Sequence, residues 1–279
     1  MSAFVGRVAA VTGAGSGIGR AVATGLARRG ARLALSDVDP AGLAETKRLV
    51  EALGADVHTA VVDVADRSGV ATWAAEVAGH HGVVHQLYNN AGIGSPGLPV
   101  VETGYEAFER VLDVNLWGVI HGTKEFVPHI IASGDGHVTT ISSLNGIMAQ
   151  PDLGPYCTSK FAVRGFSEVL QAEMAAAGHR VGVTTVYPGG VKTNIASRSE
   201  DDDSTPLTAA EQRRMDVYNE KLFKTTADEA ATAILDGVAK GRSRVLIGQA
   251  RGVDRLVRVV PGSYGRLVAH WAKRTFGTD

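Results

Sequence analysis

Tyr156 and Lys160 stand four residues apart in the segment PYCTSK (155–160), a spacing that makes two side chains neighbours on a helix. A phenol beside an ammonium group can work as an acid–base pair, because a nearby positive charge favours the phenolate and lowers the pKa of the tyrosine. The same spacing also occurs on helix surfaces where neither side chain does chemistry. The pair alone therefore leaves both interpretations open.

A glycine cluster, TGAGSGIGR (12–20), follows directly after the strand-like run RVAAVT. Its pattern is T-G-x-x-x-G-x-G, not the stricter G-x-G-x-x-G. Glycines let the backbone turn tightly and approach a pyrophosphate, whose charge is attracted by the amides at the start of a helix. With a strand before it and a helical pattern after it, the cluster predicts a dinucleotide site with contacts from Gly13, Ser16, Gly17, Ile18 and Gly19.

Asp37 ends the second strand-like run, 18 residues beyond Gly19, near the spacing expected of an acid that binds the adenosine ribose. A carboxylate there accepts hydrogen bonds from both ribose hydroxyls and repels a 2′-phosphate. The sequence therefore favours NAD as cofactor, while Arg20 and Arg32 leave NADP open. Asp39, directly before Pro40, fits the start of a turn better.

Further polar loops follow the later strand-like runs in chain order. Asp63 and Val64 come after the third run and are expected to flank the adenine. The segment NNAG (89–92) comes after the fourth, and Asn90, Ala91 and Gly92 are expected to line the cofactor. In a doubly wound sheet such loops lie at the carboxyl ends of the strands, where ligands bind.

The elements that must position these residues alternate along the chain. Short β-rich runs, several of them apolar throughout, alternate with longer helical patterns, as expected for parallel strands covered by helices on both faces. The sequence predicts an α/β fold, a doubly wound, Rossmann-like parallel sheet of about seven strands in a single domain. The expected strands are 7–12, 32–36, 57–62, 85–89, 137–142, 180–187 and 244–248, and the expected helices lie near 17–30, 40–53, 67–79, 104–132 and 154–177.

Composition narrows the classes of function. The 279 residues are 44% hydrophobic, and the formal charge of −1 gives no whole-molecule attraction to nucleic acid or to an anionic membrane. The single cysteine, Cys157, excludes an internal disulfide, and the histidines show no ligand spacing such as H-E-x-x-H, so no metal is expected. Without an apolar run of about 18 residues or a signal-peptide pattern, a cytoplasmic location is expected.

Together these motifs resemble the short-chain dehydrogenase/reductase family over roughly residues 5–250. The resemblance depends on TGAGSGIG, NNAG, the asparagine of VLDVNLWGV, ISSLNG, YCTSK and PGGVKT, in family order. It implies a catalytic set of four residues. The serine of the set stands 13 residues before the tyrosine, which selects Ser143 and not Ser142, so the set is Asn115, Ser143, Tyr156 and Lys160.

The chemistry expected of this set is hydride transfer between NAD(H) and a secondary alcohol or ketone. Tyr156 would be the acid or base, its pKa lowered by Lys160, and Ser143 would donate a hydrogen bond to the substrate oxygen. The resemblance implies that Tyr156 and Lys160 also contact the cofactor, with Lys160 binding the nicotinamide ribose, and that Asn115 holds a water in a proton relay. It further implies nicotinamide contacts from the segment PGGVKT, through Pro188, Gly189, Val191 and Thr193.

The expected substrate contacts are mostly apolar and include no arginine that could pair with a carboxylate, which favours an apolar substrate. They are Leu144, Met148, Leu153, Gly189 and Gly190. The resemblance also implies a homodimer or homotetramer. Two alternatives remain, a non-redox NAD-binding regulatory or scaffold protein and an epimerase or dehydratase on the same fold.

Two segments interrupt the alternation. Residues 194–225 contain an acidic run, Glu200 to Asp203, and are expected to form either a solvated surface loop or a lid over the site. Residues 251–279 form a basic extension with apolar residues at helical spacing, and from Lys240 to Arg274 there are nine Lys/Arg and one Asp. Such a stripe packs on its own chain or a second subunit, docks on an anionic membrane surface, binds another protein, or belongs to a frayed chain end.

Overall fold

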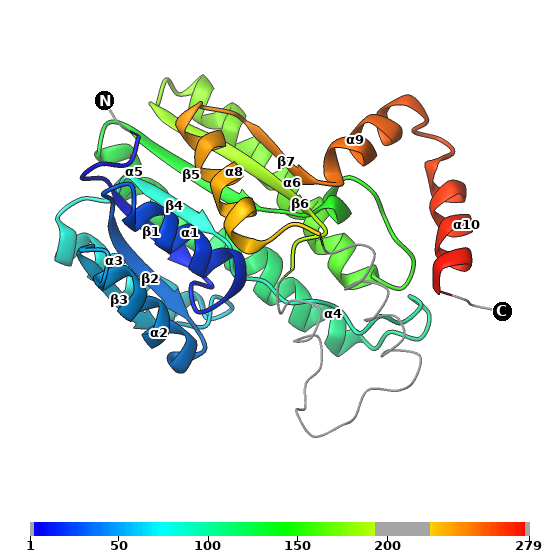
Figure 1. Ribbon diagram of the computed structural model, residues 1–279, viewed down its shortest axis with the longest axis horizontal. Coiled ribbons are helices and arrows are strands. Elements are labelled where there is room, and N and C mark those ends of the chain that lie inside the picture. The colour runs from blue at the N-terminus through cyan, green and yellow to red at the C-terminus, as the bar shows by residue number, and fades with distance from the viewer. Residues whose placement is uncertain (1–2, 193–223, 277–279) are drawn as a thin grey trace.

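A single parallel sheet of seven strands forms the centre of the computed structural model, which describes residues 3–192 and 224–276 (Figure 1). The strand order is β3-β2-β1-β4-β5-β6-β7. The predicted doubly wound parallel sheet is confirmed. Its strands are β1 (Val8–Thr12), β2 (Arg32–Asp37), β3 (Val57–Val61), β4 (Gln86–Asn89), β5 (Gly136–Ile141), β6 (Val181–Gly189) and β7 (Arg244–Gly248).

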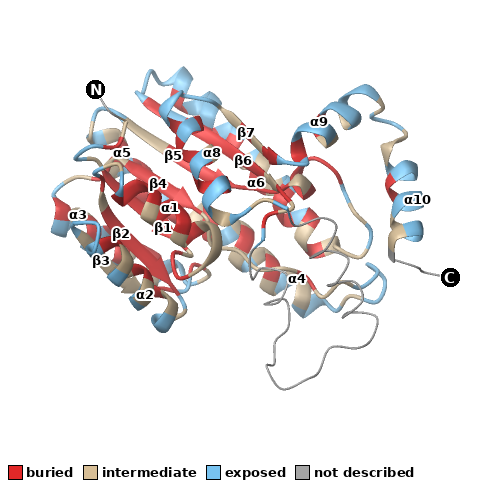
Figure 2. Ribbon diagram, in the orientation of Figure 1, coloured by how far each residue is buried: buried red, intermediate tan, exposed pale blue. Residues whose placement is uncertain are grey.

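The sheet separates two apolar cores because successive strand residues point to opposite faces. In β1, Ala9 and Val11 belong to one buried cluster, whereas Val8 and Ala10 belong to the other. The first cluster takes residues from α1 (Gly17–Ala27), α2 (Pro40–Glu51) and α8 (Ala227–Ala239). The second takes residues from α3 (Arg67–His81), α5 (Gly118–Ala132) and α6 (Gly154–Ala176). Both faces are therefore covered, which explains the continuous apolar strands (Figure 2).

The helical stretch expected at 104–132 is not one regular helix. It comprises α4 (Tyr105–Leu112), a π-helical turn η1 (Asp113–Trp117) and α5. A π turn places one extra residue in the helix and is common at functional sites. Asn115 lies inside this turn and is completely buried.

One helix, α8, was absent from the sequence prediction. It starts at a capping box in which the Thr226 side chain accepts from the Glu229 amide and the Glu229 carboxylate accepts from the Thr226 amide. The T-x-x-E spacing was the available signal for this start. The segment 194–225, expected as a loop or lid, falls almost entirely on residues outside the described ranges.

The basic C-terminal segment contains two helices, α9 (Ala250–Val259) and α10 (Tyr264–Phe276), on either side of Pro261. Asp254 of α9 accepts from Arg244 Nη2 of β7 at 2.7 Å and from Arg258 Nε at 3.0 Å. Val257 packs against a buried cluster that includes Ile147. The segment thus docks on its own chain through α9, whereas α10 stands apart from the sheet (Figure 1). None of the described helices combines the length and apolarity needed to cross a membrane.

Candidate active site

The glycine loop and the NNAG segment meet beside the carboxyl ends of β1 and β4. These adjacent strands mark the point where the strand order reverses, which is the usual ligand crevice of such a sheet. Thr12 Oγ1 accepts hydrogen bonds from the amides of Asn90 and Ala91, both at 3.0 Å. Asn90 Nδ2 donates to the carbonyls of Thr12 at 2.9 Å and Gly13 at 3.0 Å. Thr12 therefore joins the two loops, a role that sequence reasoning missed although this residue begins the motif.

The loop has space for a ligand's phosphates only because glycines form it. Gly13 and Gly17 have positive φ angles of 63° and 51°. A Cβ on Gly13 would lie 2.8 Å from Ala91 Cα, and one on Gly19 would overlap the Gly13 carbonyl. The N-cap residue of α1, Ser16, makes no side-chain cap hydrogen bond, so it leaves the first amides of α1 available. This geometry fits the pyrophosphate of a dinucleotide.

Asp37 is buried at the end of β2 and is held by two backbone amides. Its Oδ2 accepts from Gly15 N at 2.7 Å and its Oδ1 from Asp39 N at 2.9 Å. The carboxylate is thus fixed beside the glycine loop, at the position expected for a ribose ligand. Asp39 instead caps α2 by accepting from Ala41 N at 3.0 Å, as expected for the residue before Pro40.

Of the two arginines that left NADP open, Arg20 is engaged by the protein and Arg32 lies at the far end of β2. Arg20 donates to Thr46 Oγ1 at 2.9 Å, to the Gly42 carbonyl at 3.1 Å and to the Gly15 carbonyl. Its guanidinium therefore connects the loop to α2. Arg32 begins β2, at the end of the strand opposite Asp37.

The residues expected at the adenine follow β3. Asp63 is exposed, and its Oδ1 accepts from Ala65 N at 2.9 Å. Val64 is buried, and its carbonyl accepts from His121 Nδ1 at 3.0 Å. A Cβ on Gly118 would lie 2.7 Å from Val64 Cγ2, so α5 packs closely against this loop.

Tyr156, Lys160 and Ser143 come together where α6 passes the end of β5. The side chains of Tyr156 and Ser143 are hydrogen-bonded to each other. Lys160 is buried, its Nζ lies 5.5 Å from the centroid of the Tyr156 ring, and it donates to the Ile141 carbonyl at 3.2 Å. Ser142 is turned away from the tyrosine and donates to the Lys160 carbonyl at 2.9 Å. The structure thus places Ser143, and not Ser142, against Tyr156.

Asn115 lies in the π turn beside this cluster and contacts α6. Its Oδ1 accepts from Ile93 N at 2.8 Å, and its Nδ2 donates to the Ile93 carbonyl at 3.0 Å and to Ser159 Oγ at 3.1 Å. A Cβ on Gly92 would lie 3.0 Å from Asn115 Oδ1 and 3.3 Å from Lys160 Nζ. Asn115 therefore fastens the end of the NNAG loop to α6. Ser159, its partner, was not singled out in the sequence.

Burial dominates the electrostatics of the cluster. It lowers the pKa of Lys160 to about 8 and raises the pKa of the Tyr156 phenol, an effect opposed by the hydrogen bond to Ser143. Lys160 was expected to lower the pKa of Tyr156, but in the chain without cofactor the pKa of the phenol is raised instead. The physical reason is that desolvation destabilises the phenolate and the ammonium group alike. Tyr156 is accordingly protonated near neutrality.

The segment after β6 is only partly described. Pro188 and Gly189 end β6, and Val191 is buried and forms a parallel bridge with Thr225. The Gly190 carbonyl accepts from the Thr225 amide at 3.2 Å. Thr193, expected to contact the nicotinamide, lies outside the described residues.

Three apolar residues expected around the substrate lie on the segment between Ser143 and Tyr156. Leu144 belongs to the short 3-10 helix η2 (Leu144–Gly146), Met148 is buried, and Leu153 precedes α6. Leu144 also packs against the cluster that α9 joins through Val257. Cys157 is buried, and burial raises the pKa of its thiol, in agreement with a packing role.

Comparison with known proteins agrees with this geometry. Residues 7–204 match the family model for short chain dehydrogenases. The chain is 48% identical over 277 residues to SadH of Mycobacterium tuberculosis (strain ATCC 25618 / H37Rv), whose name describes an oxidoreductase, and the match covers 99% of both chains. A short-chain dehydrogenase/reductase from Burkholderia phymatum, solved in complex with NAD, superposes with a TM-score of 0.85 at 32% identity, covering 94% of this chain and 96% of that one.

A second solved structure, levodione reductase, superposes with a TM-score of 0.74 at 27% identity and covers 89% of this chain and 99% of its own. The family model spans well over half of the chain, and SadH matches it over nearly the full length. This chain therefore belongs to the short-chain dehydrogenase family of oxidoreductases.

Proposed function

We propose that the protein is an NAD-preferring dehydrogenase/reductase that transfers a hydride between the cofactor and an apolar secondary alcohol or ketone. The observation that carries this proposal is the Tyr156–Ser143 hydrogen bond with the buried Lys160 behind it. When bound, a nicotinamide ring would supply the hydride acceptor or donor. The chain's own residues then have to orient the substrate oxygen and move its proton.

Proton transfer is assigned to Tyr156. Its raised pKa keeps the phenol protonated near neutrality, so it can donate a proton to a carbonyl oxygen during reduction. Asn145 N donates to Ser143 Oγ at 3.1 Å and so helps to orient the hydroxyl. The Ser143 hydroxyl proton, which is directed at Tyr156 in this structure, would turn to the substrate oxygen and stabilise negative charge there. In oxidation the phenolate would accept the proton.

Lys160 and Asn115 are assigned to support this step. An ammonium group has three donors, and the Ile141 carbonyl takes one of those on Lys160, so the others can reach ribose hydroxyls near Gly92. Asn115 holds the neighbouring backbone of Ile93 in place and is assigned the proton relay.

The preference for NAD rests on the fixed Asp37 carboxylate and on the engagement of Arg20. We expect Asp37→Asn to weaken NADH binding about 10- to 100-fold and to narrow the difference between NADH and NADPH, because a charged ribose acceptor is lost. The amide oxygen can still accept from Gly15 N, and only the acceptor of the Asp39 amide is lost, so the glycine loop should remain folded. Fluorescence titration of both reduced cofactors measures the effect.

The matched control is Glu51→Gln, which removes the same charge from an exposed position at the end of α2. It should leave both affinities unchanged. Tighter binding of NADPH than NADH by the parent protein would refute the assignment of Asp37.

The substrate class is tested by a panel of steroid, polyol, acetoin-like and long-chain alcohols screened for NADH formation. Apolar members should be turned over best, because Leu144, Met148 and Leu153 offer apolar contacts. Turnover of the polyols alone, or no NADH with any member, would contradict the proposal. A regulatory or scaffold role would be consistent only with the second result.

We also propose a homodimer or homotetramer in the cytoplasm. Large side chains are exposed on three elements that pack against one another: Tyr105 of α4, Trp117 of η1 and Phe161 of α6. Exposed large side chains of this kind support a subunit contact. Light scattering of the purified chain gives the oligomeric state.

A further inference from the structure

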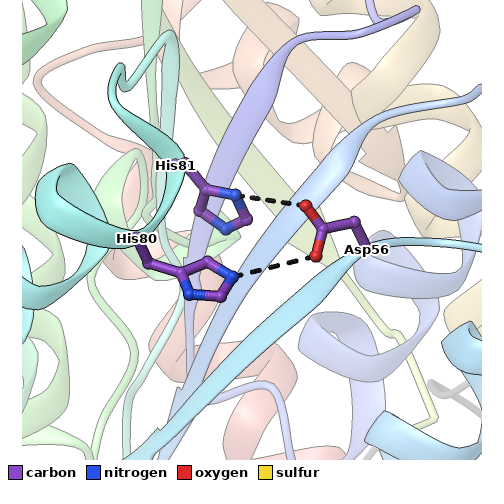
Figure 3. A group of neighbouring side chains, drawn as sticks. All are labelled: Asp56, His80 and His81. Carbon is purple, nitrogen blue, oxygen red and sulfur yellow. Dashed lines mark ion pairs between the residues drawn. The ribbon is translucent and has the colours of Figure 1, made fainter.

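Two histidines and an aspartate lie close together at the amino ends of the strands, at the opposite end of the sheet from the glycine loop. Asp56 directly precedes β3, and His80 and His81 are the last residues of α3. Figure 3 shows both imidazoles turned toward the same carboxylate. This cluster lies at the amino ends of the strands, whereas the residues assigned to hydride transfer follow their carboxyl ends.

His81 has a fixed tautomer that leaves one nitrogen available. Its side chain is completely buried, and Nε2 lies 3.1 Å from the Leu33 carbonyl, which can only accept, so Nε2 carries the proton. Nδ1 then bears a lone pair, makes no hydrogen bond within the described part of the chain, and lies 3.5 Å from Asp56 Oδ2. Two facing acceptors repel each other unless a cation or a proton lies between them.

His80 completes the arrangement from the solvent side. Its Nε2 lies 3.8 Å from Asp56 Oδ1, and the ligand atoms of all three residues lie within 4.8 Å of one another. Zinc bonds to nitrogen and oxygen at about 2.0–2.1 Å, so neighbouring ligands of a tetrahedral ion are about 3.3–3.4 Å apart. The two distances to Asp56, 3.5 and 3.8 Å, are slightly wider than this, and the distance between the two histidine nitrogens is at most 4.8 Å. The exposed His80 side chain would therefore have to rotate toward the ion.

We propose that Asp56, His80 and His81 form a binding site for a Zn²⁺ ion, with a fourth position open to water. The donor set of two imidazoles and one carboxylate is one that zinc takes in proteins. The bond from His81 Nε2 to the Leu33 carbonyl supplies the outer contact that orients a zinc-binding histidine. The Asp56 carbonyl in turn accepts from Leu33 N at 2.8 Å, which holds Asp56 beside β2.

A Zn²⁺ ion between His81 Nδ1 and Asp56 Oδ2 would replace the repulsion of these two acceptors with two ligand bonds. Metal binds the neutral form of an imidazole, in which one ring nitrogen bears a lone pair. No metal site was predicted from the sequence, because Asp56 lies on a different segment from His80 and His81 and the three residues show no regular ligand spacing.

The ion would fasten the end of α3 to the β2–β3 edge. A ligand that binds only the folded chain raises its melting temperature. We therefore expect Zn²⁺ to bind the full-length, chelator-treated protein with one ion per chain, measured by calorimetry, and to raise Tm. Co²⁺ in its place should give the intense visible bands of a tetrahedral site.

The tests are His80→Ala and Asp56→Asn, two exposed side chains whose loss leaves the His81–Leu33 bond in place. Each should weaken Zn²⁺ binding at least 10-fold and remove the Tm increase. The matched control, His179→Ala, removes an exposed histidine outside the cluster and should bind like the parent. Equal binding by parent and both cluster variants, or none by the parent, would overturn the site. NADH binding by the zinc-free protein is a separate readout, which should not change.

Discussion

Tyr156→Phe is expected to lower kcat by about 100- to 10,000-fold, the contribution typical of a positioned acid or base. The substitution removes only the hydroxyl, so the ring keeps its packing next to Lys160 and the loss is chemical. NADH affinity should stay within about twofold of the parent, because the phenol makes no contact with the glycine loop or with Asp37. Steady-state rates with the best alcohol of the panel, together with NADH fluorescence, separate the two effects.

The matched control for this substitution is Tyr105→Phe, which removes a hydroxyl from an exposed tyrosine on α4. It should be as active as the parent. Undiminished turnover by Tyr156→Phe would show that another group moves the proton, and the assignment of Ser143 to the same substrate oxygen would fail with it.

Lys160→Met is expected to have the second large effect: it should lower activity and raise the stability of the cofactor-free chain. Turnover and NADH affinity should fall, because the variant loses the donors assigned to the ribose. Without cofactor at pH 7 the variant should be about 1–2 kcal/mol more stable. Burial lowers the lysine pKa from 10.5 to about 8, which corresponds to about 3 kcal/mol, and the lost hydrogen bond to the Ile141 carbonyl offsets part of it.

This difference in stability should depend on pH. Between about pH 8 and 10.5 the unfolded lysine keeps a proton that the folded one has released, so the parent gains stability as the pH rises. The methionine variant has no such gain, and its advantage should therefore shrink over that window. Urea unfolding at several pH values measures it.

The control for the lysine substitution is Lys124→Met, at an exposed position on α5. It should change neither turnover nor the pH dependence. A Lys160→Met chain that is less stable than the parent at pH 7, or that retains turnover, would contradict the account of this residue.

Local patterns were sufficient for much of the fold. Parallel strands buried on both faces must be apolar throughout, so each strand was predicted to within about two residues. The glycine pattern likewise marked the loop, since no other residue fits against Ala91 or the Gly13 carbonyl. The π turn was not predicted, because the one extra residue at Asn115 changes hydrogen bonding without changing the apolar pattern.

By itself, the sequence determined the fold class, the family and the residues of the Ser143, Tyr156 and Lys160 cluster. Each of these could be read from the order of short motifs along the chain and from the residue spacing within them. Only the tertiary structure decided how those groups are solvated. Burial keeps Tyr156 protonated and lowers the pKa of Lys160, an effect that linear spacing cannot express. It also decided that the Arg20 guanidinium donates to Thr46 and Gly42 of α2 and that Asp56 lies beside His80 and His81. Such contacts form only when distant segments pack together.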